Sequence, residues 1–566
     1  MGDDLRTLPL IETARSPGFL TFRWEFPRRQ SLLIDLGWQH ALARRALMAA
    51  PPRRIERLAL RLLTTADAAC DRLYGWRANP LYQSGTIVIA LLLVLIVTGL
   101  WLILFYRVGA PYSSVAALAA DPYLGRWVRG VHRYASDAAV VFVLLHLWRM
   151  FAQGRSWGPR ALAWTSGVVA LGLLFVCGLT GYVMVWDSFG QLVAQEGARL
   201  LDTLPILSEP IGRAFTGEED LAGAFFFVNL FAHIAIPLGL GLVLWLHVSR
   251  VARPTLLPPR RLTVALIAVL LAAALLRPPA LGSAATPFHL PESVHLDWLY
   301  AFWVPLVRAV QPATAFVLLA LGVLLLLAVP LIMKRRASAA PPPSVVNEDI
   351  CTGCRQCSID CPYEAITMIE RPGGGRSAEV ARVDPALCVS CGICAGSCAP
   401  MGVGPPGRTG RDQLARVREF IAGLETGRTV VVCCDRGARG WRTALEEEGA
   451  AVYEVDCAGN LHTSVIELLV RGGAAGALVI ACPPRDCWNR EGPRWLSERI
   501  YHDREAELQP RVDRRRVHVA TANASESAEA IAALRDFTAA TARLEEPQPE
   551  SADVDLVCEP VPAEEA

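Results

Sequence analysis

The sequence has almost no net charge, no recognisable secretory signal and only two cysteines in its first 350 residues. Its 55 lysines and arginines balance 54 aspartates and glutamates, so the net charge is +1. This balance gives no indication of nucleic-acid binding. The N-terminus, MGDDLRTLPLIETARSPGF, lacks the charged start, the apolar run and the small-residue cleavage site of a signal peptide. We therefore expect these residues to remain on the mature protein.

Apolar residues are abundant and unevenly distributed. They make up 53% of the 566 residues and concentrate in six segments: 85–106, 134–152, 161–185, 222–249, 262–277 and 313–333. Because a helix that spans a bilayer needs about 20 apolar residues, we expect six transmembrane helices. Segment 262–277 is short enough that a buried or tilted helix is the alternative. Residues 53–77 alternate basic and apolar positions at helical spacing, which predicts an interfacial helix.

The basic residues predict how these helices are oriented. Arginine and lysine gather before the first segment and after the second, fourth and sixth, whereas the loop from 187 to 220 is acidic. The positive-inside rule places the basic connections in the cytoplasm. Six spans then leave both termini in the cytoplasm, as expected for a multi-pass protein of a bacterial or archaeal inner membrane.

Four histidines are spaced for ligation. His132 and His146 are 14 residues apart in one apolar helix, and His233 and His247 are 14 apart in another. Fourteen steps fall about 40° short of four turns, so each pair shares one helix face, roughly 21 Å apart. Two such helices can clamp two stacked haems, and bis-histidine coordination favours electron transfer. The alternative, histidines that line a pore or only hydrogen-bond, does not explain two matched pairs.

Two pairs of glycines repeat the same spacing. Gly85 and Gly99 are 14 residues apart in the first segment, and Gly167 and Gly181 are 14 apart in the third. A glycine has no side chain, so we expect these positions to let a flat macrocycle approach the backbone.

Residues 75–250 resemble the four-helix haem core of cytochrome b from bc and plastid-type complexes. The strings NPLYQSG, LIVTGLWLILFY, RWVRGVHRYAS and LTGYVMVWDSFG carry the resemblance. It implies two b haems, one held by His132 and His233 near the outer face and one held by His146 and His247 near the cytoplasm.

The resemblance extends to residues around the histidines. Arg129 and Arg149 resemble arginines that balance haem propionates, with anchoring at the membrane face as the alternative for Arg149. Plastid-type relatives carry a cysteine before the first helix that attaches an extra haem. Gln83 stands there in this sequence, and no C-x-x-C-H occurs. We expect no covalent haem.

A quinone site is also implied by the resemblance. The family places Pro-Glu-Trp-Tyr at its outer quinol-oxidising site, where the carboxylate accepts a quinol proton. The nearest string here is HLPESVHLDWLYAFW. It offers Asp297 and Tyr300 as catalytic candidates, with Glu292 as a rival acid. Interfacial anchoring is the alternative for Trp298 and Tyr300.

Fourteen of the 16 cysteines follow residue 350, most at close and regular spacing, which favours metal ligation over disulfides. Two runs, C-x₂-C-x₂-C-x₃-C-P and its repeat without the proline, are typical of bacterial-type ferredoxins with two [4Fe-4S] clusters. In this class the fourth cysteine of each run ligates the other cluster. Zinc is the alternative. The resulting ligand sets are Cys351, Cys354, Cys357 and Cys398 for one cluster, and Cys388, Cys391, Cys394 and Cys361 for the other.

Five more cysteines follow or end buried strands: Cys433, Cys434, Cys457, Cys482 and Cys487. In a parallel sheet the strand ends converge on one edge. Residues 428–545 resemble the small iron-sulfur (delta) subunit of methyl-viologen-reducing hydrogenases, which implies one [2Fe-2S] cluster. The first two cysteines are adjacent, so which of them is a ligand stays open, and a thiol group without a cluster is the alternative.

The predicted fold class is multidomain. A transmembrane haem-binding helical bundle precedes an α+β ferredoxin-like domain and an α/β parallel-sheet domain. We expect an N-terminal extension (1–52), a cytochrome b-like membrane domain (53–336), a linker (337–345), a ferredoxin domain (346–402), a delta-subunit-like domain (410–545) and a disordered acidic tail (546–566).

The predicted function is electron transfer between membrane quinone and a soluble cytoplasmic partner, as a subunit of a bc-like quinone oxidoreductase. Electrons would pass from the outer haem to the inner haem, the ferredoxin domain and then the terminal domain, which would hand them over. Alternatives are a non-catalytic membrane anchor for a hydrogenase or heterodisulfide-reductase-like enzyme, and a redox sensor. No Rieske-type Cys-x-His pair is present, so a Rieske-type or cytochrome subunit is an expected partner, and the family resemblance suggests a homodimer in a larger complex.

Overall fold

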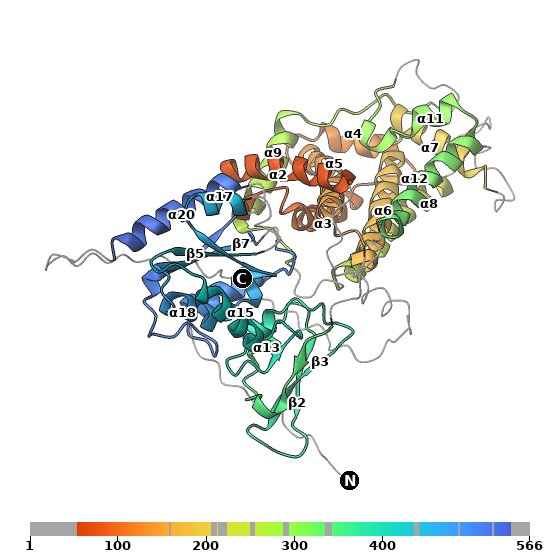
Figure 1. Cartoon of the computed structure of the whole chain (residues 1–566). Coiled ribbons are helices and arrows are strands. Elements are labelled where there is room, and N and C mark those ends of the chain that lie inside the picture. Colours follow the sequence, from red (N-terminus) through yellow and green to blue (C-terminus); the bar gives the residue numbers. More distant parts are fainter. Residues whose placement is uncertain are drawn as a thin grey trace, which may run out of the picture.

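The computed structural model describes residues 54–157, 160–204, 212, 215, 223–249, 255–286, 294–333, 342–434, 441–484, 487–522 and 526–544. These residues form a helical part, a small cysteine-rich part and an α/β part (Figure 1). The expected N-terminal extension and acidic tail lie outside the described residues, as does most of the linker.

The helical part has four long helices at its centre. Helix α3 packs against α5, α6 packs against α8, and α5 also contacts α6. Small residues on α5 such as Ala135 and Ala139 are completely buried and let neighbouring helices approach. The elements of this part are α2 (Arg54–Tyr74), η1 (Trp76–Ala78), α3 (Ser84–Ile103), α4 (Pro111–Ala120), α5 (Gly125–Ala152), α6 (Ala161–Val185), α7 (Ser188–Leu201), α8 (Gly223–Ser249), α9 (Arg260–Leu276), α10 (Trp298–Ala301), α11 (Val304–Ala309) and α12 (Pro312–Ile332).

Five of the described helices are long and apolar enough to cross a membrane: α3, α5, α6, α8 and α12. The expected span at 262–277 forms α9, a helix of 17 residues that packs on α5, so a sixth span stays a prediction. Helix α5 begins at Gly125, earlier than the apolar run at 134 that predicted it. Arginines interrupt the apolar run between these positions but favour helix formation, so the helix continues through them.

The cysteine-rich part consists of two small antiparallel ladders and short helices. Strand β1 (Val345–Val346) pairs with β4 (Val403–Gly404), which brings the two ends of this part together, and β2 (Ile366–Glu370) pairs with β3 (Glu379–Val383). The helical elements are η4 (Glu348–Ile350), α13 (Gln356–Ile359) and α14 (Ile393–Gly396). These helices are single turns, so loops position most of the cysteines.

The α/β part is built on a parallel sheet with strand order β6-β5-β7-β8. All four expected strand segments form strands: β5 (Thr429–Cys434), β6 (Ala451–Val455), β7 (Gly476–Ala481) and β8 (Val517–Thr521). Both faces of β5 are buried, which explains its continuous apolar sequence. The other elements are α15 (Gly410–Ala422), α17 (Arg442–Glu447), η5 (Ala458–Asn460), α18 (Thr463–Arg471), α19 (Gly492–Tyr501), η6 (Arg514–Arg516) and α20 (Ser527–Ala542).

Candidate redox centres

Each of the four histidines faces one of the four spaced glycines across a pair of packed helices. A Cβ added at Gly85 would lie 2.9 Å from Cε1 of His146, and the corresponding distance at Gly181 to His233 is 3.0 Å. At Gly99 the nearest atom is Cε1 of His132, and at Gly167 it is Cε1 of His247, both at 3.2 Å. In the described structure, the atoms nearest to these glycines belong to imidazole rings.

A hydroxyl group precedes every one of these glycines and contacts the same histidine. Thr98 Oγ1 lies 2.9 Å from Nδ1 of His132, and Thr180 Oγ1 lies 3.0 Å from Nδ1 of His233. On the inner pair, Ser166 Oγ is 3.0 Å from the Nδ1 of His247, and Ser84 Oγ makes a longer contact of 3.4 Å with His146. A Ser/Thr-Gly dipeptide thus stands at each of the four glycines that face a histidine, a signal that the sequence analysis missed.

The hydrogen bonds orient the imidazoles for ligation. Nδ1 of His233 lies 2.9 Å from the carbonyl oxygen of Cys177. A carbonyl oxygen only accepts, so Nδ1 carries the proton and the lone pair is on Nε2. This pattern, in which one ring nitrogen is hydrogen-bonded and the other is left to bind a metal, is typical of haem and metal-ligating histidines.

The histidines lie near one another in two pairs. His132 is close to His233, and His146 is close to His247. All four rings come from long apolar helices, two on α5 and two on α8. The donor set, the hydrogen-bonded Nδ1 atoms and the close glycine contacts fit two bis-histidine haems.

The two arginines expected near the propionates have protein partners in the described structure. Arg129 Nη1 donates to the carbonyl oxygen of Pro279 at 2.9 Å. Arg149 Nη1 lies 2.9 Å from both carboxylate oxygens of Asp67 on α2, and both side chains are at most 3% exposed. This buried ion pair fixes α2 to the C-terminal end of α5, a contact that the sequence analysis did not foresee.

Asp297 is part of a polar cluster beside the helix turn that carries His132. It precedes α10, where its Oδ1 accepts a hydrogen bond from the backbone N–H of Leu299 at 2.8 Å. Its Oδ2 contacts the guanidinium of Arg133 and the hydroxyl of Tyr182. Arg133 follows His132 in the sequence and also contacts Asp137. A candidate proton acceptor is therefore already paired with a cation and a phenol.

The other quinone-site candidates have different environments. Tyr300 is completely buried, and its hydroxyl is 2.7 Å from Oγ of Ser136. The ring lies so close to Gly178 that a Cβ there would be 2.0 Å from it. Trp298 is 67% exposed, as expected for an interfacial anchor. Glu292 lies outside the described residues.

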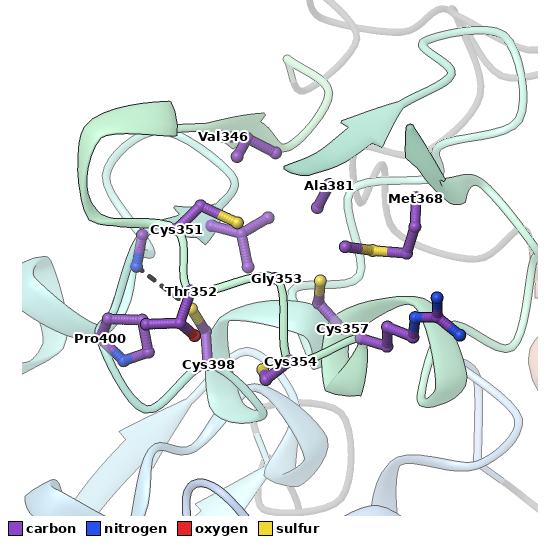
Figure 2. A pocket seen from close by; sticks show the side chains of 13 residues that line it. Val346, Cys351, Thr352, Gly353, Cys354, Cys357, Met368, Ala381, Cys398 and Pro400 are labelled. Atoms are coloured by element: carbon purple, nitrogen blue, oxygen red, sulfur yellow. Dashed lines mark hydrogen bonds between the residues drawn. The ribbon is translucent and has the colours of Figure 1, made fainter. Parts of the chain in front are cut away.

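The first expected iron-sulfur ligand set surrounds one pocket. Figure 2 shows the side chains of Cys351, Cys354, Cys357 and Cys398 around it, with Met368 and Ala381 from the β2–β3 hairpin above. Cys398 joins this pocket although it belongs to the second run of cysteines. No three His, Cys, Asp or Glu side chains in the described residues are close enough to hold a single metal ion.

The two cysteine runs adopt the same backbone conformation. In the first run Gly353 and Arg355 have positive φ angles of 71° and 67°, and the equivalent residues of the second run, Ser390 and Gly392, have 59° and 79°. The fourth cysteine of each run accepts a backbone hydrogen bond from the residue four positions later, at 3.3 Å in the first run and 3.2 Å in the second. The runs are thus structural repeats, which fits two equivalent clusters.

The second expected ligand set also converges. Cys391 and Cys394 both interact with Cys361, and Cys394 interacts with Cys388. Burial raises the pKa of the Cys394 thiol to about 12. A buried thiol of this kind becomes a thiolate when it binds a metal, because the positive charge of the metal stabilises the anion. Ser344 adds contacts of 3.3 Å to the sulfurs of Cys388 and Cys394.

The third cysteine group lies at the carboxyl edge of the parallel sheet. One pocket is lined by Cys434, Cys457, Cys482 and Cys487, together with Asp456, Trp488 and Asn489. Hydrogen bonding from the Cys487 thiol, with further donors from Asn489 and two backbone amides, lowers the pKa of the Cys457 thiol. A group of four sulfurs with a stabilised thiolate fits a small iron-sulfur cluster.

Strand alternation separates the two adjacent cysteines of β5. Cys433 is completely buried and packs with Val431, Trp441 and Leu445 in the core on one face of the sheet. Cys434 points to the other face and lines the pocket. Of the two candidates left open by the sequence, Cys434 is therefore the one that joins the other three cysteines.

Comparisons with known proteins match three regions in succession. Residues 71–253 match the family of cytochrome b/b6/petB, residues 350–402 match the 4Fe-4S dicluster domain, and residues 439–545 match the delta subunit of methyl-viologen-reducing hydrogenase. A solved structure described as a hyperthermophilic respiratory Complex III is 19% identical, with a TM-score of 0.38, over 46% of this chain and 77% of that chain. The family matches imply haem b and iron-sulfur clusters. The chain is thus a membrane electron-transfer subunit in which a cytochrome b region is joined to a 4Fe-4S dicluster region and a hydrogenase delta-subunit-like region.

Proposed function

We propose that this chain connects the membrane quinone pool with a soluble cytoplasmic redox partner, through two b haems, two [4Fe-4S] clusters and one [2Fe-2S] cluster. The observation that carries the proposal is the fourfold arrangement in which a histidine, a glycine and a hydroxyl residue meet across paired helices. The histidine pairs are His132 with His233 and His146 with His247. When bound, the haems would supply one-electron transfer between these two levels of the bundle.

The protein residues perform the accompanying binding and proton steps. The Nε2 atoms of the histidines would hold the haem irons, while the Ser/Thr hydroxyls orient the imidazole rings. At the outer face we propose that Asp297 receives a quinol proton, with Tyr300 as part of the site. Because Asp297 contacts both Arg133 and Tyr182, proton uptake requires this cluster to rearrange. Glu292 is the rival acid.

The direction of electron flow has an energetic consequence. Moving one electron inward across an inside-negative membrane works against roughly 2.3 kcal/mol per 100 mV. Quinol oxidation at the outer site followed by inward transfer therefore stores energy. The opposite direction would reduce quinone from a cytoplasmic donor.

A redox titration of the purified chain tests the cofactor content. Haem absorbance and cluster EPR are followed together as the potential is lowered. We expect two b-type haem steps, two [4Fe-4S] signals and one [2Fe-2S] signal. A single haem step with one protoporphyrin per chain would rule out the paired ligands, and two haem steps without [4Fe-4S] signals would rule out the cytoplasmic branch.

The second candidate function is a membrane anchor that conducts electrons without quinone chemistry. This function is favoured by the ion pair between Asp297 and Arg133, because the pairing stabilises the charged form of the carboxylate that would otherwise accept the quinol proton. Quinol-driven haem reduction in isolated membranes separates the two functions. We expect Asp297→Asn combined with Glu292→Gln to abolish it. A control is Asp121→Asn, which changes a carboxylate that accepts backbone hydrogen bonds just before α5. Full activity of the double variant would favour the anchor.

The remaining parts of the proposal concern assembly. We propose that the iron-sulfur domains and both termini lie in the cytoplasm, that a Rieske-type or cytochrome subunit contributes to the outer site, and that the complex contains two copies of the chain. The basic loops that follow α5 and α8 support this orientation through the positive-inside rule.

A further inference from the structure

The helical part, the cysteine-rich part and the α/β part meet at one junction. Arg155, in the loop after α5, donates from Nη2 to the carbonyl oxygen of Cys487 at 3.1 Å. Arg490, three residues after Cys487, donates to the carbonyl oxygen of Pro362 at 2.8 Å. The segment that carries Cys487 therefore contacts the loop after α5 and, through Arg490, the cysteine-rich part.

The junction lies at the inner end of the haem core. Arg155 interacts electrostatically with His146, and Arg160, at the start of α6, interacts with His247. Arg160 also interacts with Tyr363 of the cysteine-rich part, and Tyr363 in turn interacts with Cys391 and Cys487. The inner histidine pair, the third cysteine group and the second ligand set of the cysteine-rich part are thus neighbours.

The third cysteine group and the second ligand set are in direct backbone contact. A Cβ added at Gly396 would lie 2.7 Å from the carbonyl oxygen of Gly459, and one at Gly459 would lie 2.5 Å from Cα of Gly492. At Gly492 the nearest atom is Sγ of Cys457, at 3.0 Å. The loops that carry the two sites therefore approach each other closely at these glycines.

A buried arginine holds this contact together. Arg499 on α19 is 1% exposed. It donates to Oγ of Ser397 at 2.7 Å and to the carbonyl oxygen of Gly459 at 2.8 Å. Asn460 adds a hydrogen bond of 2.9 Å to the carbonyl oxygen of Gly392. These bonds join the loops that carry the two sites, so their separation is fixed by the fold.

The first ligand set has a different position. Cys351 and Cys354 are partly exposed, and the neighbouring Thr352 and Arg355 are exposed. The β2–β3 hairpin above this pocket lies at the end of the molecule farthest from the membrane helices (Figure 1). Of the three groups of cysteines, this one is best placed to meet a soluble protein.

We infer that the third cysteine group (Cys434, Cys457, Cys482 and Cys487) is an internal relay between the haem site of His146 and His247 and the second ligand set, and that the first ligand set exchanges electrons with the soluble partner. The inference rests on the proposed function and reverses the order expected from the sequence, in which the terminal domain was the exit. Each transfer moves one electron, oxidising one site as it reduces the next, and no bond is made or broken. A quinol supplies two such electrons and releases two protons.

Spin coupling in the full chain tests the relay without quinone turnover. After chemical reduction, the EPR signal of the third cysteine group should be broadened by the adjacent second ligand set. Cys482→Ser or Cys434→Ser should remove the EPR signal of the third cysteine group and the broadening of the signal from the second ligand set. Cys70→Ser, in a cysteine of α2, is the matched control and should leave both unchanged. Independent, unbroadened signals would overturn the relay.

Accessibility to a soluble paramagnetic chelate tests the exit. A dysprosium chelate should enhance the relaxation of the first ligand set most strongly, with Cys351→Ser used to assign that signal, and the third cysteine group least. Equal or stronger enhancement at the third cysteine group would overturn the order. Both measurements work even if quinol fails to reduce the haems, so failure of the quinone proposal is distinguishable from failure of the relay.

Discussion

Replacing Gly181 by alanine is expected to disturb the outer histidine pair selectively. The new Cβ would lie 3.0 Å from Cε1 of His233 and 3.6 Å from its Nδ1, so the imidazole must shift. Forcing an extra methyl group into a packed contact costs about 1–3 kcal/mol. Alanine stabilises a helix by about 0.5–1 kcal/mol relative to glycine. This stabilisation offsets part of the destabilisation that the new contact causes.

Gly172 provides the matched control because it lies in the same helix, and a Cβ there would have nothing within 4 Å. Gly172→Ala should therefore stabilise the helix in the same way, but without a contact between the new methyl group and a histidine. The difference between the two variants therefore isolates about 1–3 kcal/mol of strain on the His233 ring. If the whole strain energy opposes binding of the haem iron by His233, the affinity for that haem falls roughly 5- to 150-fold.

The assay is haem content and a potentiometric titration of each purified variant. In Gly181→Ala we expect one of the two haem steps to shift or disappear, with the other unchanged. Gly85→Ala, where the Cβ would lie 2.9 Å from Cε1 of His146, should affect the other step. Identical titrations for Gly181→Ala and Gly172→Ala would refute the reasoning, and so would loss of both haems in Gly172→Ala.

Three further substitutions follow from single contacts. Thr98→Val removes the hydroxyl 2.9 Å from the outer histidine of α5 and should weaken haem retention by about 10- to 100-fold, measured as haem per chain. Cys434→Ala should eliminate the [2Fe-2S] EPR signal and its iron, whereas Cys433→Ala should keep both. Asp67→Asn removes the carboxylate charge beside the buried Arg149 and should lower stability by about 3–5 kcal/mol, seen as a lower thermal midpoint in detergent. An unchanged midpoint would show that this ion pair does not hold α2.

Local spacing predicted much of the candidate sites. The 14-residue intervals of the histidines and glycines depend only on helix geometry, and all eight residues lie on the helices expected for them. The grouping of Cys398 with the first cysteine run is a property of the repeated motif. Strand alternation could also have separated Cys433 from Cys434, because adjacent residues of one strand face opposite sides.

Tertiary contacts could not be predicted in this way. Asp67 and Arg149 are 82 residues apart in sequence, and neither position has a pattern that points to the other. The contact of Asp297 with Arg133 likewise depends on how α10 sits on α5 and α6. The position of the third cysteine group between the other parts depends on packing between domains, for which spacing within each domain holds no information.

Because of this junction, one measurement is enough to show on which side of the membrane the iron-sulfur domains lie. Arg155 and Arg160 belong to the short loop between α5 and α6, the same loop whose basic charge predicted a cytoplasmic position. Arg155 donates a hydrogen bond to the carbonyl oxygen of Cys487 and lies near His146, and Arg160 lies near Tyr363 of the cysteine-rich part and near His247. The inner histidines, this loop and the iron-sulfur domains must therefore lie on one side of the membrane. Any measurement that places the loop also places the point at which electrons leave the bundle.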